Sequence, residues 1–469
     1  MPVTVDRSSS GGLSWTSLRR RALTAWDYVL MARDHVLVAW DRVLEGGLWS
    51  FGAYLIATGF VYTFVLISVN RHTGQHLELE MLPARTMSWL TNWHTYGFAK
   101  YAGLLVYSSD GLTVYKSHSG FHLWPLYAIE LVIRVFIGRF SYRAAAVFNQ
   151  SVIWVGAALL GWLGMRLTKH VPRHHAFFLG LGCAVVYQTF PMNLMNYWYL
   201  NPISFAINAM LVFWLAESYQ RNGSNDRWIS IATSGSVVLL ALSYSQALTF
   251  FFLGCYVVAD WMIEGSRMSV RRVLRYVVAP AAAVVLFQTL QIAWVQFNIA
   301  NVNFTGNLNF ADFLWRSGLD GSTQYYADHW NLLFSRKPSF GYPGRNPALV
   351  LEWKWLFIGG LAALAVIGAR FIHSAATEGR PRLVLLATGL TCYALSAFVF
   401  SQGVVIHPDV WDVLLAWLLI AAVFCFLPAD LEVMTKRTGL AMFVSLFVTA
   451  CYVMVQLRAY AAAVPVAVR

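Results

Sequence analysis

Charged residues are scarce in this sequence. Asp, Glu, Lys and Arg make up only 12% of the 469 residues, whereas 58% are hydrophobic and the mean hydropathy is +0.54. Because a soluble domain carries roughly a quarter charged residues, this composition excludes a cytosolic enzyme, a disordered protein and a nucleic-acid-binding domain. A cleavable N-terminal signal is not expected either, since the first long apolar run begins only near Gly47.

Cysteine and the common cofactor motifs are also sparse. The sequence has no P-loop, no Gly-rich dinucleotide fingerprint and no Cys/His spacing of the kind that binds a metal. All of its cysteines lie within apolar segments, so we expect buried free thiols rather than disulfides. These five residues are Cys183, Cys255, Cys392, Cys425 and Cys451.

Long apolar runs are abundant and recur from residue 47 almost to the C-terminus. Runs of this length cross a bilayer as helices. The predicted fold class is therefore an all-α polytopic membrane protein with about eleven transmembrane helices. Their predicted positions are residues 47–69, 143–165, 176–191, 200–217, 229–244, 246–263, 276–295, 352–369, 383–400, 410–427 and 438–456.

The distribution of Lys and Arg predicts how these helices are oriented. If the N-terminus is cytoplasmic, the inside loops and the tail carry most of the basic residues that give the chain its formal charge of +12. The outside loops after residue 145 then hold only Arg316, Arg336, Lys337 and Arg345. The charge distribution therefore predicts an integral membrane protein with its N-terminus in the cytoplasm. The expected location is a bacterial inner membrane.

The stretch 122–138 is apolar but carries Glu130 and Arg134. Each charge at mid-bilayer costs about 2.5–3.5 kcal/mol, and a crossing here would also invert the orientation of every later loop. We therefore expect a juxtamembrane helix on the outer face. Polar and aromatic residues then gather in two outer loops, 70–142 and 296–351, which favours a site at the outer membrane surface over a transporter.

The domain organisation follows from these expectations. It comprises a cytoplasmic tail (1–46), a first transmembrane helix (47–69), an outer loop with juxtamembrane helices (70–142) and a helical membrane domain (143–469) that contains the outer loop 296–351. Within the tail, an A-x-D-x-V-L pattern repeats at a spacing of seven, which predicts an amphipathic helix. That helix either lies on the cytoplasmic leaflet or binds a protein partner through residues 13–45.

This layout resembles that of the GT-C glycosyltransferases, which use polyprenyl-phosphate sugars. The run NWHTYGFAKYAGLLVYSSDGLTVYKSHSGFHLWPLY (92–127) has the family's first-loop layout of a helix, a Gly-containing turn and a short polar motif before an apolar juxtamembrane helix. The run VFSQGVVIHPDVWDVLLAWLLI (399–420) resembles the family's late outer loop and span. The resemblance covers about 50–456 in layout. It implies transfer of a sugar to a lipid, glycan or protein acceptor, with inversion at the anomeric carbon.

Members of that family normally carry an acidic residue near the start of the first loop, where it deprotonates the acceptor hydroxyl. Here the corresponding stretch reads Asn92-Trp93-His94. The candidate bases are therefore His94, whose imidazole titrates near neutral pH, and the displaced carboxylates Glu80 and Asp110. The missing acid equally fits an inactive member.

The first loop also holds candidate ligands for the lipid phosphate, because Lys and imidazolium donate charge-assisted hydrogen bonds to phosphate oxygens. They are Lys116, His118 and His122, of which His118 falls where members of the family carry a His-Pro-Pro or Lys-Pro-Pro motif. An ordinary interfacial cluster is the alternative. A divalent metal stays open as a cofactor, although no carboxylate is paired with these histidines.

Further candidates lie later in the chain. Arg336 and Lys337 are adjacent cations in the second large loop and are candidate phosphate ligands. His407 and Asp409 form either an acid–base pair or a turn with a helix N-cap. The candidates for stacking on a sugar are Trp198 and Tyr199, which an aromatic belt at the membrane interface explains equally well.

Two other functions stay open. One is a polysaccharide polymerase or ligase-like enzyme, and the other is a non-catalytic membrane scaffold subunit that keeps a GT-C-like fold. The predicted partners are a polyprenyl-phosphate-linked sugar and membrane lipid, with no nucleic acid.

Overall fold

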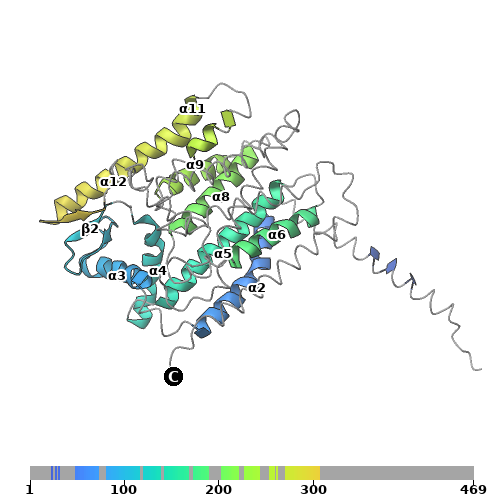
Figure 1. Cartoon of the computed structure of the whole chain (residues 1–469), viewed down its shortest axis with the longest axis horizontal. Helices are drawn as coiled ribbons and strands as arrows, with labels where there is room; N and C mark the ends of the chain where they lie inside the picture. The colour runs from blue at the N-terminus through green and yellow to red at the C-terminus, as the bar shows by residue number, and fades with distance from the viewer. Residues whose placement is uncertain are drawn as a thin grey trace, which may run out of the picture.

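The computed structural model describes a mostly helical chain (Figure 1). The described residues are 23–24, 27–28, 30–31, 48–72, 81–116, 120–138, 142–167, 173–189, 202–220, 227–242, 253–258, 260–261 and 270–306. A helical fold is thus confirmed for this part of the chain. The four predicted C-terminal spans and most of the predicted heptad helix lie outside the described residues.

In the described part of the chain, five long helices pack side by side. They are α2 (Leu48–His72), α5 (Tyr142–Leu167), α6 (Arg173–Thr189), α8 (Pro202–Gln220) and α9 (Arg227–Leu242). Helix α5 packs against α2, α6 and α8, and α8 packs in turn against α9 (Figure 1). Each of these helices begins and ends within a few residues of a predicted span. The reason is that each predicted span is one continuous apolar run, and each run forms one helix.

Small residues let α5 and α6 pack closely around Tyr54 of α2. A side chain at either Gly161 or Gly180 would collide with the Tyr54 ring or its hydroxyl group. The Tyr54 hydroxyl donates a 3.0 Å hydrogen bond to the carbonyl oxygen of Phe177, and the two rings stack with centroids 4.5 Å apart. The three helices therefore share a buried aromatic contact that requires both glycines.

A long continuous helix follows at residues 270–298. It consists of α11 (Val270–Val273), the π-helical turn η2 (Leu274–Val278) and α12 (Ala279–Asn298). Pro280 has no N–H to donate to the carbonyl four residues earlier, and the amide of Ala279 instead donates to the carbonyl oxygen of Leu274, five residues away. The π turn thus lies directly before the proline.

Among the described residues, two helical segments are long and apolar enough to span a membrane. They are Val147–Arg166 within α5 and Leu274–Asn298, which includes α12. This finding supports membrane association in general terms, while the predicted set of eleven spans goes beyond it.

The remaining elements form a small unit of mixed structure, which we call the loop unit. It comprises α3 (Met81–Tyr96), β1 (Leu105–Val106), β2 (Thr113–Tyr115), η1 (Phe121–Leu123), α4 (Trp124–Ile137) and β3 (Asn303–Thr305). The strands form one sheet in the order β1-β2-β3, with β1 antiparallel and β3 parallel to β2. The sheet was not expected from the sequence, and it joins the two predicted outer loops.

The loop unit has its own apolar core. Trp93, Val106, Val114 and Leu126 are fully buried in it, and the Trp93 indole donates a 2.6 Å hydrogen bond to the carbonyl oxygen of Leu104. Gly120 begins η1 with a φ of 68°, and a side chain there would collide with the carbonyl oxygen of Gly103. This position therefore needs glycine both for its backbone conformation and for its space.

Helix α12 ends against the loop unit. The Gln291 side chain donates to the carbonyl oxygen of Ala102 at 2.7 Å, and the Trp294 indole donates to that of Ala99 at 2.8 Å. Val295 and Ile299 are buried in the same core as the first-loop residues. The end of α12 and the first loop therefore form one packed body (Figure 1).

Helix α4 occupies the stretch that was predicted to be a juxtamembrane helix. Its 14 residues extend about 21 Å, which is shorter than the roughly 30 Å hydrocarbon core of a bilayer. One face buries Glu130, while Val135 and Phe136 on another face are 81% and 84% exposed. This amphipathic character fits a helix at an interface better than a helix that crosses it.

Candidate functional site

His94 lies in the last turn of α3 and is exposed at the surface of the loop unit. The two residues before it face inward: Asn92 is buried and Trp93 is fully buried. The alternation follows from helical geometry, which turns successive residues by about 100°. His94 is thus presented on a rigid helix whose opposite side is held in the core.

Asn92 has a structural role that explains why no carboxylate stands there. Its side-chain amide donates to the carbonyl oxygen of Val106 at 2.9 Å and to that of Ser108 at 3.4 Å. Close by, the Tyr96 hydroxyl donates to the carbonyl oxygen of Ser109. An ionised carboxylate cannot donate a hydrogen bond, so aspartate at position 92 would break this connection between α3 and the turn after β1.

Asp110 lies in that same turn, and His94 lies on α3. The hydrogen bonds of Asn92 and Tyr96 join these two segments. Its carboxylate accepts hydrogen bonds from the Ser108 hydroxyl and from the backbone N–H of Leu112. These two donors, the hydroxyl first, hold the pKa of Asp110 below its usual value. Asp110 is therefore exposed and ionised, and its hydrogen bonds stabilise the turn.

Lys116 marks the place where the two predicted loops meet. Its backbone N–H donates to the carbonyl oxygen of Thr305 at 2.9 Å, which extends the pairing of β2 with β3. Its side chain is half-buried. An ammonium group at this junction can donate hydrogen bonds to an anion bound beside the sheet.

His122 differs from what a phosphate ligand requires. It lies in η1 with only 2% of its surface exposed, and burial lowers the pKa of its imidazole to about 3. The ring is therefore neutral at physiological pH and does not supply the imidazolium charge that the sequence-based hypothesis assigned to it. We leave His122 out of the proposed phosphate contacts.

The other predicted site residues lie outside the described part of the chain. They are Glu80, His118, Trp198, Tyr199, Arg336, Lys337, His407 and Asp409. Within the described residues, no three His, Cys, Asp or Glu side chains are grouped so that they could hold a metal ion. The identity and need of a metal stay open.

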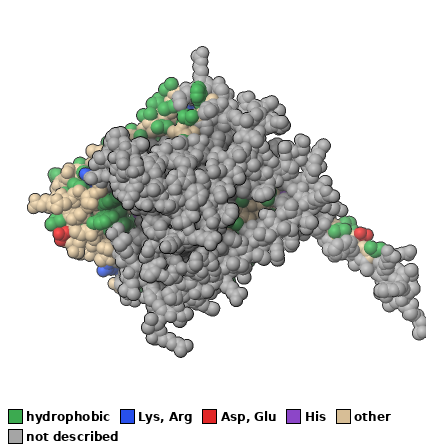
Figure 2. Space-filling view, in the orientation of Figure 1, with side chains coloured by type: hydrophobic (Ala, Val, Ile, Leu, Met, Phe, Trp, Pro, Cys, Tyr) green, Lys and Arg blue, Asp and Glu red, His purple; other side chains and the backbone are tan. Residues whose placement is uncertain are grey.

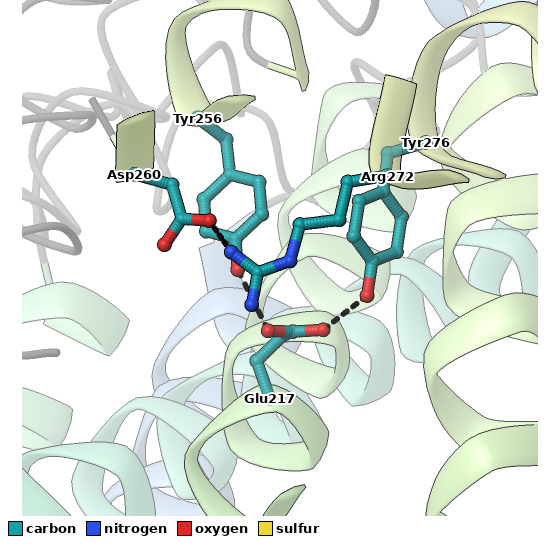
Figure 3. A network of polar contacts seen from close by, with 5 residues as sticks. All are labelled: Glu217, Tyr256, Asp260, Arg272 and Tyr276. Atoms are coloured by element: carbon teal, nitrogen blue, oxygen red, sulfur yellow. Dashed lines mark hydrogen bonds and ion pairs between the residues drawn. The ribbon is translucent and has the colours of Figure 1, made fainter. Parts of the chain in front are cut away.

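A second polar cluster, which the sequence analysis did not find, links three helical segments (Figure 3). Glu217 of α8 is only 6% exposed, and its carboxylate accepts hydrogen bonds from the hydroxyl groups of Tyr256, at 2.7 Å, and of Tyr276. Asp260, also buried, forms an ion pair with Arg272 of α11. The guanidinium group lies between the two carboxylates in the close-up view.

This cluster lies far from the loop unit. Tyr276 belongs to the π turn, and a rise of 1.5 Å per residue separates it from Asn298 at the other end of α12 by about 33 Å. Its aromatic members also pack edge to face, with the ring centroids of Tyr256 and Tyr276 5.8 Å apart. The cluster therefore ties α8, the helical residues 253–258 and 260–261, and the π turn together. Acidic residues near the ends of apolar runs were the signal for it in the sequence.

No protein-family model, no curated protein and no solved structure matches the chain. Membership of the GT-C glycosyltransferases therefore stays a prediction from the sequence.

Proposed function

We propose that the chain is a membrane glycosyltransferase that moves a sugar from a polyprenyl-phosphate donor to an acceptor at the outer face of the membrane. The observation that carries this proposal is the parallel pairing of β2 with β3. It brings residues of the two predicted outer loops into one unit with His94, Asp110 and Lys116, which are candidates for the base and for a phosphate contact.

The same pairing supports the prediction that α4 does not cross the membrane. Two strands of one sheet lie on the same side of a membrane, so an even number of crossings must separate β2 from β3. Six spans were predicted between them, and α4 was not among these six. A seventh crossing by α4 would place the two strands on opposite sides.

In the proposed reaction the acceptor hydroxyl attacks the anomeric carbon of the donor sugar. A new C–O bond forms as the bond from that carbon to the phosphate oxygen breaks, and the polyprenyl phosphate leaves with the electron pair. His94 takes the proton of the hydroxyl, because its imidazole is exposed and carries a ring nitrogen that can accept a proton. Lys116 stabilises the charge on the departing phosphate. Asp110 is the alternative base.

The test is sugar release by the purified full chain from polyprenyl-phosphate mannose, glucose, galactose and aminoarabinose. We expect turnover of at least one donor, and His94→Ala is expected to lower kcat by about 100-fold or more, the usual contribution of a general base. Asp110→Asn serves as the matched comparison, because it removes the alternative base. A normal rate in His94→Ala together with a lost rate in Asp110→Asn would assign the base to Asp110.

Failure of the proposal has a distinct signature. If the wild-type chain neither binds nor turns over any of the four donors, the glycosyltransferase proposal is wrong. A stoichiometric partner that copurifies with such an inactive chain would then favour the scaffold function.

A further inference from the structure

The three-stranded sheet of the loop unit has two chemically different faces. Side chains alternate along a strand, and the register pairs Val106 with Val114 and Val114 with Phe304 on the face that packs into the core. The opposite face carries residues of both predicted loops. Its accessible members are Tyr107, Thr113, Tyr115, Asn303 and Thr305, whereas Leu105 in the same row is buried in the core.

Aromatic rings form a row on this opposite face. The ring centroids of Tyr107 and Tyr115 are 5.2 Å apart, and Trp89 of α3 continues the row with its centroid 5.6 Å from that of Tyr107. Tyr107 is 39% exposed, whereas Trp89 is only 7% exposed and belongs to the core of the loop unit. The row therefore presents ring surface on a rigid base.

Neutral hydrogen-bonding groups stand beside the rings. Thr113 lies opposite Asn303, and Tyr115 lies opposite Thr305 in the parallel pair. Asn303 is exposed, and the two threonines are half-buried. In the space-filling view, the described atoms at this end of the molecule are mainly hydrophobic side chains (green) and uncharged side chains or backbone (tan), with small charged groups at the edge (Figure 2).

We propose that this face binds the pyranose ring of a neutral glycan acceptor. A pyranose ring has apolar C–H faces that stack on aromatic rings, and its hydroxyl groups pair with neutral amide and hydroxyl side chains. The five accessible residues of the face carry no formal charge, so they lack the cations that a phosphate backbone or an anionic lipid headgroup requires. They also do not form the continuous aliphatic surface that would bind a lipid chain.

The inference rests on the proposed function and makes it more specific, since it selects a glycan from the acceptors that the resemblance allows. Asp110 lies in the turn between Tyr107 and Thr113 of this face, and Asn92 of α3 holds that turn through its hydrogen bonds to Val106 and Ser108.

The test is saturation-transfer NMR on the full chain in lipid nanodiscs, with maltotriose, cellotriose, chitotriose and mannotriose as probes. We expect saturable binding of at least one probe. Tyr107→Ala should weaken it about tenfold, while Tyr107→Phe keeps the ring and should stay within about twofold of wild type. Trp228→Ala is the matched control, because Trp228 is a 78% exposed aromatic residue on α9.

Two results would overturn the inference: no saturable binding of any probe, or binding that Tyr107→Ala leaves unchanged. The donor assay separates this failure from failure of the proposed function. Donor turnover without oligosaccharide binding would keep the transferase and remove the glycan face. Oligosaccharide binding that depends on Tyr107, in a chain that turns over no donor, would keep the face and remove the transferase.

Discussion

His122 shows how the position of one side chain decides its chemistry. The sequence places it two residues after Gly120 in a basic, polar stretch, which suggested a charged ligand. The structure instead buries the ring in the core of the loop unit, where burial lowers its pKa to about 3. Nothing in the local sequence distinguishes the two outcomes, because the burial comes from residues that are distant along the chain.

This pKa makes stability depend on pH. In the unfolded chain His122 titrates near its ordinary value of about 6.5, so the unfolded state binds one more proton than the folded state between about pH 6.5 and 3. The contribution of His122 to the free energy of unfolding is therefore complete above the unfolded-state pKa. It decreases as the pH falls through this window, by up to about 1.4 kcal/mol per pH unit. Thermal unfolding of the purified chain at pH 7, 6 and 5 measures it.

The control is His122→Gln, which keeps a polar side chain of similar reach but cannot titrate. We expect its unfolding midpoint to fall less steeply with decreasing pH than that of wild type. Parallel slopes for the two proteins would show that the ring is not buried in its neutral form.

At the scale of elements, the close approach of α5 and α6 depends on glycine. A Cβ atom at Gly180 would collide with the Tyr54 hydroxyl and with the carbonyl oxygen of Gly161. The tyrosine can move, but the carbonyl belongs to the backbone of α5, so the helices must separate. We expect Gly180→Ala to lower the free energy of unfolding by about 1–3 kcal/mol, measured as a lower midpoint of thermal unfolding in detergent.

Gly235 of α9 supplies the matched control, since a Cβ atom there meets no other atom within 4 Å. Alanine in an open helical position is favourable by roughly 0.5–1 kcal/mol relative to glycine. Gly235→Ala should therefore raise the midpoint slightly. Equal effects of the two substitutions would contradict the packing of α5 against α6.

The helices could be predicted from the sequence because each corresponds to one continuous apolar run. The strands could not. They are only two or three residues long, and β2 pairs with β3 across nearly two hundred residues of sequence. Period-2 alternation is not readable in such short segments. The loop unit therefore appears in the sequence only as two separate polar stretches.

The buried cluster around Glu217 was missed for a related reason. Glu217, Tyr256 and Tyr276 lie on three segments, and each residue alone is an ordinary feature of the end of an apolar helix. Their meeting depends on how the helices pack, together with the π turn before Pro280. Acidic residues near the ends of apolar runs mark candidate members of such a cluster, but hydropathy and charge patterns do not indicate which helices meet.

At the scale of the whole molecule, the described parts of the two predicted outer loops and the end of α12 form one body, with the Glu217 cluster at the other end of that helix. The difference between these two ends agrees with the predicted positions of the basic residues. The basic residues Arg227, Arg271 and Arg272 belong to predicted inside loops, whereas the loop unit contains the residues proposed for catalysis. A bilayer between these two ends would separate the proposed site from the cytoplasm.

Everything proposed for the loop unit requires that it face away from the cytoplasm. The direct measurement is labelling of Asn303→Cys and Trp228→Cys with a membrane-impermeant maleimide in bacterial spheroplasts, with the wild-type chain as the background. Asn303 in β3 and Trp228 near the start of α9 are both exposed. We predict that position 303 is labelled in intact spheroplasts and position 228 only after permeabilisation. Labelling of 228 in intact spheroplasts, with 303 protected, would place the loop unit in the cytoplasm and contradict the proposed function.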